Sequence, residues 1–276
     1  MRKFRLDWLP GRVYLERLYP LTWQEIKTSQ QQVHQLEDIL VYGALPGLLA
    51  EPDIDTRKEQ LNAYTHLYLD EEIRAEAATR NLPRFTQFLR LTALESGSAP
   101  NFSKIGQQIG TSHTTIREYF QILQDTLILH ELKAFEKTRN RVLKSSRYFF
   151  FDTGVRNSAA QLPLEKGLLN LEMGRLFDHF VVLEAIAHFQ KDFELSYYRD
   201  KAGQKVDLIL EDGTKRIAVK IKATQRPLSR HFKGLETFSK EYECDQTLLI
   251  CKIERPKKFG AHLALPWEQF SQLLAR

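Results

Sequence analysis

The segment VDLILEDGTKRIAVKIKAT, residues 206–224, constrains the fold more than any other part of the chain. Its two apolar runs flank a tight turn, and this pattern predicts a pair of β-strands. Asp207 lies on the first predicted strand and Lys222 on the second. Carboxylates on strands hold Mg²⁺ in metal-dependent nucleases, and a nearby lysine stabilises the negative charge that builds up on the phosphate. The segment therefore predicts the scaffold of a nuclease site.

One position of this scaffold carries the wrong charge for metal binding. Such a site needs a second carboxylate two residues before Lys222, and the residue there is Lys220. A cation at a ligand position repels Mg²⁺ by several kcal/mol at short range, even at an effective dielectric of about 20. We therefore expect no tight metal site, no metal cofactor and no nuclease catalysis.

Composition and charge leave several functions open. The 276 residues are 42% hydrophobic and 27% charged, and the net charge is +5. This length is sufficient for two domains. Basic residues gather in four late segments: 147–156, 197–205, 214–233 and 252–258. These segments form either a solvated basic face or a surface that follows the phosphates of a nucleic acid.

Nothing in the sequence indicates a membrane or a secretory route. No apolar run reaches the length of about 20 residues that spans a bilayer, and no signal-peptide pattern is present. Cys244 and Cys251 enclose six residues, a spacing that suits neither a CxxC metal site nor a convincing disulfide. We expect buried or partly buried thiols in a cytoplasmic protein.

Residues 31–95 have the apolar spacing of helix-bundle faces. One stripe, which includes Val33, Leu36 and Leu40, stops at Gly43. The Pro and Gly content of residues 44–53 predicts a turn. For this region, packing is a simpler explanation than a functional site.

Residues 101–155 have the order helix, glycine-containing turn, helix and β-hairpin, which is typical of a winged helix-turn-helix. The second helix is expected to begin near Ser112, with Ile116 and Phe120 facing inward. Its exposed side chains are expected to be those of His113, Thr114, Thr115, Arg117 and Glu118. Polar side chains at this end of a helix read base edges, but only Arg117 is cationic, and winged helices also bind proteins. Contact with DNA and contact with a protein both stay open.

The last region, from about residue 171, predicts a small α/β layer. An amphipathic helix over 171–190 is expected to bury Leu176, Phe180, Leu183 and Ala187. Strands are predicted within 194–200, 204–212, 215–224 and 245–253, with a crossover helix over 230–242 between the last two.

A set of motifs, taken in order, resembles one protein family. The motifs are LPGRVYLERLYPLTWQEI (9–26), YGALPGLL (42–49), LNAYTHLYLDEEI (61–73), IGQQIGTSHTTIREYFQIL (105–123), KSSRYFFFDTGV (144–155), GRLFDHFVVLEAI (174–186) and the segment 197–224. Together they resemble the C-terminal part, a domain of unknown function called DUF4143, of bacterial and archaeal AAA-type ATPases.

The resemblance implies an α+β fold in three parts. Residues 1–30 would be the remnant of the end of an ATPase domain. Residues 31–165 would be a helical bundle with the winged helix-turn-helix. Residues 166–276 would be a small α/β domain that resembles restriction endonucleases of the PD-(D/E)xK type.

The resemblance also implies roles for single residues. Asp178, Asp207 and a carboxylate at position 220 would surround a metal, and Lys222 would contact the transferred phosphate. Asp178 stands where relatives usually carry Glu, and Glu184 also matches the relatives' helix pattern. The family's P-loop, GxxxxGK[ST], does not occur in the sequence. Arg12, which resembles a nucleotide-sensing arginine, would then meet no phosphate, and we expect no ATP hydrolysis.

The leading hypothesis is a non-catalytic, cytoplasmic module without a cofactor. It would be the C-terminal half of such an ATPase and would bind double-stranded DNA, a protein partner or an ATPase subunit. DNA contacts would come from the helix at 113–117 and, along the backbone, from Lys220 and Lys222.

Two alternatives remain. An active Mg²⁺-dependent nuclease would use a migrated carboxylate, with Glu184, Glu211 or Asp200 as the candidate. An assembly module would oligomerise through Trp267 and Phe270 on a terminal amphipathic helix.

Overall fold

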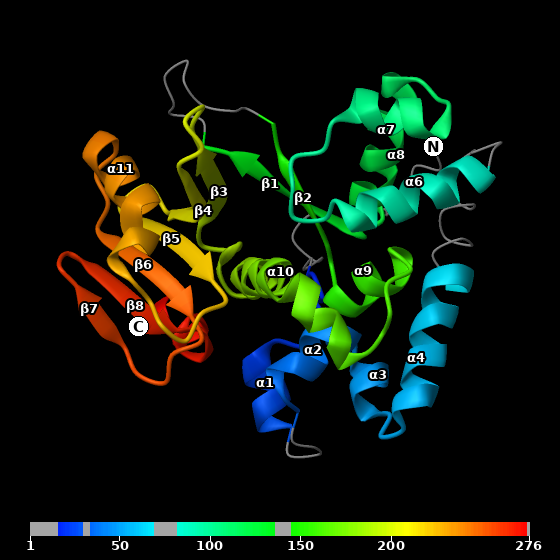
Figure 1. Ribbon diagram of the computed structural model, residues 1–276, viewed down its shortest axis with the longest axis horizontal. Coiled ribbons are helices and arrows are strands. Elements are labelled where there is room, and N and C mark those ends of the chain that lie inside the picture. The colour runs from blue at the N-terminus through cyan, green and yellow to red at the C-terminus, as the bar shows by residue number, and fades with distance from the viewer. Residues whose placement is uncertain (1–15, 30–33, 69–81, 136–144, 275–276) are drawn as a thin grey trace, which may run out of the picture.

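The computed structural model describes residues 16–29, 34–68, 82–135 and 145–274. Within these ranges the chain forms an eight-stranded mixed sheet together with many helices, so the expected mixture of α and β structure is confirmed. A long helix, α10 (Leu169–Phe189), runs between the sheet and the helices of the first half of the chain (Figure 1). The predictions for Arg12, and for residues 69–81 and 136–144, lie outside the described residues.

The strand order in the sheet is β2-β1-β3-β4-β5-β6-β8-β7. β3, β4 and β5 are antiparallel neighbours, and β6 pairs in parallel with β5 after a crossover through helix α11. The four strands and the crossover helix predicted for the last region are therefore confirmed. β7 and β8, which extend the sheet beyond β6, were not predicted. The bounds are β1 (Leu129–Ala134), β2 (Arg147–Phe150), β3 (Glu194–Arg199), β4 (Lys205–Glu211), β5 (Arg216–Lys222), α11 (Lys233–Glu241), β6 (Gln246–Cys251), β7 (Lys257–Phe259) and β8 (His262–Pro266).

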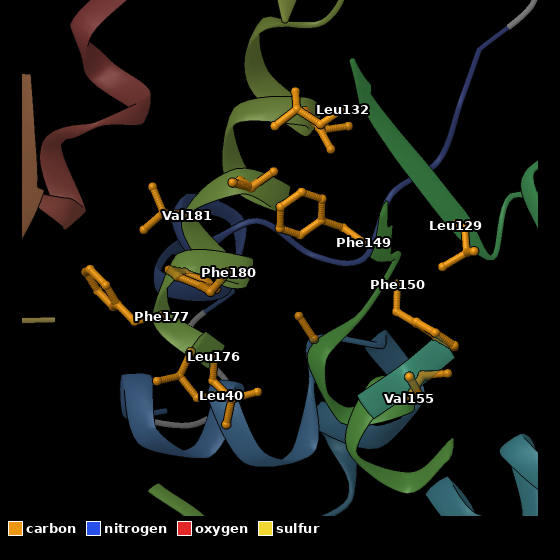
Figure 2. Close-up of a cluster of buried hydrophobic side chains, with 14 of the residues drawn as sticks. Leu40, Leu129, Leu132, Phe149, Phe150, Val155, Leu176, Phe177, Phe180 and Val181 are labelled. Carbon is orange, nitrogen blue, oxygen red and sulfur yellow. The ribbon is translucent and has the colours of Figure 1, made fainter. Parts of the chain in front are cut away.

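Helix α10 lies at the centre of the main hydrophobic core. Leu176 and Phe180 are buried, as predicted, but Phe177 and Val181 on other sides of the helix are buried as well. Leu183 and Ala187 are only half-buried. A helix that is apolar all round packs against neighbours on all sides. The prediction of a single buried face was therefore too narrow, because β4, β5, the β1-β2 hairpin and α2 (Leu36–Tyr42) all pack against α10. Figure 2 shows the side chains from the hairpin and from α2 beside this helix.

The helices predicted within residues 31–95 are present in the described residues. They are α2, α3 (Pro46–Ala50), α4 (Ile54–Ala63), the π-helical turn η1 (Tyr64–Tyr68) and α6 (Leu82–Leu94), and α1 (Trp23–Thr28) precedes them. The turn predicted for residues 44–53 was wrong in its first part, because α3 forms there. Pro46 occupies the first turn of α3, where the missing N–H of proline costs no hydrogen bond.

Two of the sequence motifs meet where α9 (Thr153–Ala159) begins and α2 ends. Asp152 is buried, and its carboxylate accepts hydrogen bonds from the N–H groups of Ala44 at 2.7 Å and Val155 at 2.9 Å. Gly43 has a φ of 81°, and a Cβ atom there would collide with the Asp152 carboxylate. Asn157 donates to two carbonyls at the end of α2. These contacts satisfy backbone groups that helix ends leave free.

The two helices predicted for this region are present as α7 (Phe102–Ile109) and α8 (His113–Asp125), joined by a short turn. Gly110 ends α7 with a φ of 69°, in the left-handed region that favours glycine. Ile116 and Phe120 are buried, as predicted. The antiparallel β1-β2 hairpin follows, and β1 also pairs in parallel with β3. The hairpin is thus part of the large sheet, and its interpretation as the wing of a winged helix stays a prediction.

The C-terminal segment packs into the core. Residues 267–274 form two short 3₁₀ helices, η4 (Trp267–Gln269) and η5 (Ser271–Leu274), in place of the predicted amphipathic helix. The ring of Trp267 lies 4.7 Å from that of Trp23, and the ring of Phe270 lies 5.3 Å from that of Phe189. The prediction that these two residues form an oligomerisation surface was wrong for Phe270, which is 2% exposed.

Candidate functional site

Asp207 lies at an irregularity in the pairing of β3 with β4. Ser196 pairs with Ile209, and Tyr198 pairs with Val206, so β4 contains one residue more than β3 between these pairs. An extra residue of this kind is a β-bulge, which changes the direction of nearby side chains. As a result, Val206 and Ile209 both pack in the core cluster next to α11, although a regular strand would put them on opposite faces. The bulge sets the position of Asp207 between them.

Both carboxylate oxygens of Asp207 have cationic neighbours. Oδ2 lies 2.8 Å from Nζ of Lys220 and accepts a hydrogen bond from the N–H of Ile221 at 2.9 Å. Oδ1 lies 3.0 Å from Nζ of Lys205, in an ion pair whose geometry is not that of a hydrogen bond. Burial by itself would raise the pKa of Asp207, but Lys220, Lys205 and Arg147 outweigh it and lower this pKa to about 2. Asp207 is therefore ionised at neutral pH.

Arg147, the first residue of β2, pairs with the other carboxylate of the site. Its Nη2 donates to Oδ2 of Asp178 at 2.6 Å, its Nη1 to the carbonyl of Asp207 at 3.2 Å and its Nε to the carbonyl of Gly97 at 2.8 Å. Burial raises the pKa of Asp178, and the charge of Arg147 acts in the opposite direction. One planar guanidinium group thus joins α10, β4 and the segment after α6.

Lys220 occupies the position at which a metal site would need an anion. Its side chain is 15% exposed, and its ammonium group is held by Asp207. Burial lowers the pKa of Lys220, while Asp207 opposes this effect. Lys222, two residues later, is exposed. The structure therefore brings Asp178, Asp207 and Lys220 together, as predicted, and leaves Lys222 at the surface.

The geometry of this site opposes a divalent ion. No group of three or more His, Cys, Asp or Glu side chains suited to a metal occurs in the described parts of the chain. Asp178 and Asp207 each already have a basic partner at 2.6 Å and 2.8 Å. To bind between them, a metal would have to displace Lys220, and breaking a buried ion pair costs about 3–5 kcal/mol.

The carboxylates considered as migrated ligands have other partners. Glu184 accepts a hydrogen bond from the N–H of Trp23 at 2.9 Å, which holds α1 against α10. Glu211 lies at the other end of β4 and pairs with Arg216 at 2.8 Å. Asp200 accepts a hydrogen bond from the N–H of Gln204 at 2.8 Å in the β3-β4 turn. The structure therefore places none of them beside Asp207 as a third ligand.

The candidate DNA-reading side chains lie elsewhere, at the start of α8. His113, Thr114 and Arg117 are exposed, as predicted. Thr115 is half-buried, and its N–H and hydroxyl group both contact Oγ of Ser112, at 3.1 Å and 3.0 Å. In the sheet order, β3 lies between the β1-β2 hairpin, which follows α8, and the strands β4 and β5 (Figure 1). The two predicted nucleic-acid elements thus come from different parts of the fold.

Arg147 and Lys205 were not predicted as site residues. Arg147 is part of the motif KSSRYFFFDTGV, but no local spacing connects it to Asp178 or Asp207. Lys205 precedes Asp207 by two residues, and the bulge in β4 determines how the two side chains meet. Only the tertiary structure shows these two contacts.

The two cysteines are free thiols, and one is buried and the other partly buried, as predicted. Burial raises the pKa of both Cys244 and Cys251 to about 11. Neither thiol is therefore a ready nucleophile at neutral pH. No helix in the described ranges is both long and apolar enough to cross a bilayer.

The site thus has two carboxylates, each paired with a cation, on a mixed α/β scaffold. Comparisons with known families support the DUF4143 part of the predicted resemblance. Residues 173–270 match the domain of unknown function DUF4143. Residues 33–166 match a second domain of unknown function, DUF8612, which the resemblance did not include. A search of curated proteins found no match. Neither domain match concerns an ATPase or a nuclease activity.

Proposed function

We propose that this chain is a non-catalytic module that binds double-stranded DNA through a nuclease-like scaffold whose metal site is closed. The distance of 2.8 Å between Nζ of Lys220 and Oδ2 of Asp207 carries the proposal. In a working site a divalent ion would neutralise the carboxylates, whereas here side chains of the protein do so. The scaffold keeps a cationic surface without a means of activating water.

The charges of the site support binding over catalysis. Asp178 and Asp207 contribute two negative charges, and Arg147, Lys205 and Lys220 contribute three positive charges. Lys222 adds a further cation at the surface. An excess of positive charge attracts phosphates and repels divalent metals. The same excess disfavours the alternative of a nuclease with a migrated carboxylate.

The predicted relation to AAA-type ATPases indicates in which kind of protein this module would act. The chain would be the C-terminal, DNA- or partner-binding part of a nucleotide-driven protein. The DUF4143 match over residues 173–270 is compatible with this relation but does not by itself test it.

Two measurements on one protein sample test the proposal. Fluorescence anisotropy with a labelled DNA duplex should show salt-dependent binding with little sequence preference. Incubation of supercoiled plasmid with Mg²⁺ or Mn²⁺ should show no nicking above that of an Asp207→Ala control. Nicking that the control abolishes would contradict the absence of catalysis. Failure to bind duplex at low salt would remove the DNA-binding function.

A further inference from the structure

One end of the sheet carries a concentration of exposed cations. β4 and β5 are antiparallel, with Leu208 opposite Val219, so the start of β4 lies beside the end of β5. The end of β3 lies there as well, because Arg199 pairs with Lys205. We call this surface the terminal basic patch. It consists of Lys201, Lys205, Lys222, Arg226, Arg230 and Lys233, all of them exposed.

The loop between β5 and α11 brings two arginines to this end of the sheet. Pro227 is buried and anchors the loop between Arg226 and Arg230. The N–H of Arg226 donates to Oγ1 of Thr224 at 3.1 Å, and the carbonyl of Thr224 accepts from the N–H of Lys252 at 2.9 Å. The loop is therefore attached to the end of β6, and its two arginines are presented from a fixed backbone.

The start of α11 packs against this end of the sheet. A Cβ atom at Gly234 would collide with the carbonyl oxygen of Lys205, so the helix touches the first residue of β4. The pKa of His231 is lowered first by burial and then by the charges of Arg230 and Lys222. These contacts place cations from the β4 start, the β5 end and the η3 turn (Ser229–Phe232) on one surface.

The patch differs from several less exposed basic residues of the fold in having few acidic partners. Arg147, Arg156, Arg216 and Lys252 each form an ion pair with a carboxylate. Among the six patch residues, Lys205 alone has an ion pair within the described part of the chain. The remaining cations are held close together without a neutralising side chain, which costs free energy through mutual repulsion.

The acidic side chains at this end do not compensate the patch. Asp207 is occupied by Lys205 and Lys220. Asp200 accepts the N–H of Gln204 in its own turn. Glu236, on the first turn of α11, lies 3.8 Å from Nε2 of His262. The patch therefore has a net positive charge and offers donors to an anionic ligand from outside the chain.

We propose that the terminal basic patch binds the phosphodiester backbone of double-stranded DNA and supplies more of the affinity than the exposed face of α8. This inference rests on the proposed function, since it names the surface and the ligand chemistry of that binding. Phosphates are contacted by such cations without regard to base sequence. The α8 face presents Arg117 next to Glu118, so its net charge there is close to zero. Lys220 is held by Asp207 and is not among the residues that contact DNA in this proposal.

A pair of charge-matched variants tests the inference. The patch variant carries Lys222→Gln, Arg226→Gln and Arg230→Gln. The control variant carries Arg255→Gln, Lys257→Gln and Lys258→Gln, which are exposed cations near β7 at the other edge of the sheet. Each variant loses three positive charges, and circular dichroism establishes that both are folded. The probe is a fluorescein-labelled duplex of mixed sequence, titrated over a range of salt concentrations.

We expect the patch variant to bind DNA at least about tenfold more weakly than wild type at about 0.1 M salt. Each lost phosphate contact should reduce the slope of log K against log salt by about 0.9, so the slope should fall by roughly 2 to 3. The control variant should keep the wild-type slope. Polyglutamate, a polyanion without phosphate, should compete poorly for the patch.

Every other outcome would overturn the inference, and the outcomes can be told apart from one another. Equal losses in both variants would mean that binding depends on total charge alone. A wild-type slope in the patch variant, together with weaker binding by Arg117→Ala, would move the contact to α8 and leave the proposed function intact. Efficient competition by polyglutamate would indicate an acidic polypeptide as the ligand. No binding by wild type would remove the proposed function and the inference together.

Discussion

Lys220 and Asp207 approach each other from adjacent strands, and their charged atoms are 2.8 Å apart in an almost buried ion pair. The same ammonium group blocks the point at which a divalent ion would contact Asp207. Charge at this position can be reversed by a single substitution, which makes the expected absence of metal binding testable.

Lys220→Glu should create a binding site for Mn²⁺, because the new carboxylate would join Asp178 and Asp207. Without metal, the variant should be destabilised by about 3–5 kcal/mol, since Asp207 loses its partner and gains a like charge. Calorimetric titration should detect Mn²⁺ binding, and Mn²⁺ should raise the Tm. Lys220→Gln is the control, because it removes the cation without adding a ligand. Tight Mn²⁺ binding by the wild-type protein would contradict our interpretation.

The low pKa of Asp207 predicts a specific acid sensitivity. Its pKa is lowered from 3.8 to about 2 in the folded state, so its contribution to stability is complete above pH 3.8 and is lost as the pH falls toward 2. The lost contribution should be about 2 kcal/mol. Urea unfolding at a series of acidic pH values measures it. Asp207→Asn should remove this component, whereas Asp192→Asn at an exposed position should leave it unchanged.

Gly43→Ala should destabilise the protein by at least about 3 kcal/mol, since it combines left-handed strain with a buried collision. Gly43 has a φ of 81°, and the added methyl group would collide with Asp152. Gly47→Ala is the matched control, because no neighbouring atom lies within 4 Å of its Cβ position and it is in α3. The control should be neutral or slightly stabilising. Similar Tm values for the two variants would show that the close approach of Gly43 and Asp152 contributes little to the stability of the protein.

Arg147→Lys should cost about 2–4 kcal/mol although it preserves charge. A lysine ammonium group cannot reach the carboxylate of Asp178 and the carbonyls of Gly97 and Asp207 in the geometry of the guanidinium fork. Arg175→Lys, at an exposed residue with one hydrogen bond to the carbonyl of Leu94 and a long ion pair with Glu172 at 3.7 Å, should cost less than about 1 kcal/mol. Chemical denaturation of both variants measures the difference. Equal losses of stability in the two variants would mean that the three hydrogen bonds of Arg147 stabilise the protein no more than the contacts of Arg175 do.

Local sequence patterns predicted the elements that consist of long apolar runs. The strands at 194–222 and 246–251 and the helix α10 belong to this group, because burial on one or both faces requires such runs. β7 consists of Lys257, Lys258 and Phe259, which is too short and too polar to show a strand pattern. α3 was missed because Pro and Gly usually indicate a turn, although a proline is well tolerated where a helix begins.

The candidate site could be predicted only in part. Asp178, Asp207 and Lys220 come together as the family resemblance implied, since two of them lie on adjacent strands and the third on the helix that covers them. Arg147 reaches the site from a strand 31 residues before Asp178 in the sequence, and no periodicity relates the two. The contact of Lys205 depends on a bulge, which arises from the pairing of two strands and not from either strand alone.

The short parallel pairing of β1 with β3, at Lys133 with Ser196 and Ala134 with Tyr197, joins the two segments that match separate domain families. If the polypeptide were cut between them, β3 would become an outer strand with open N–H and C=O groups. Such an edge recruits strands from other molecules and promotes aggregation. In the intact chain each segment therefore covers a strand edge of the other, and the two share one sheet.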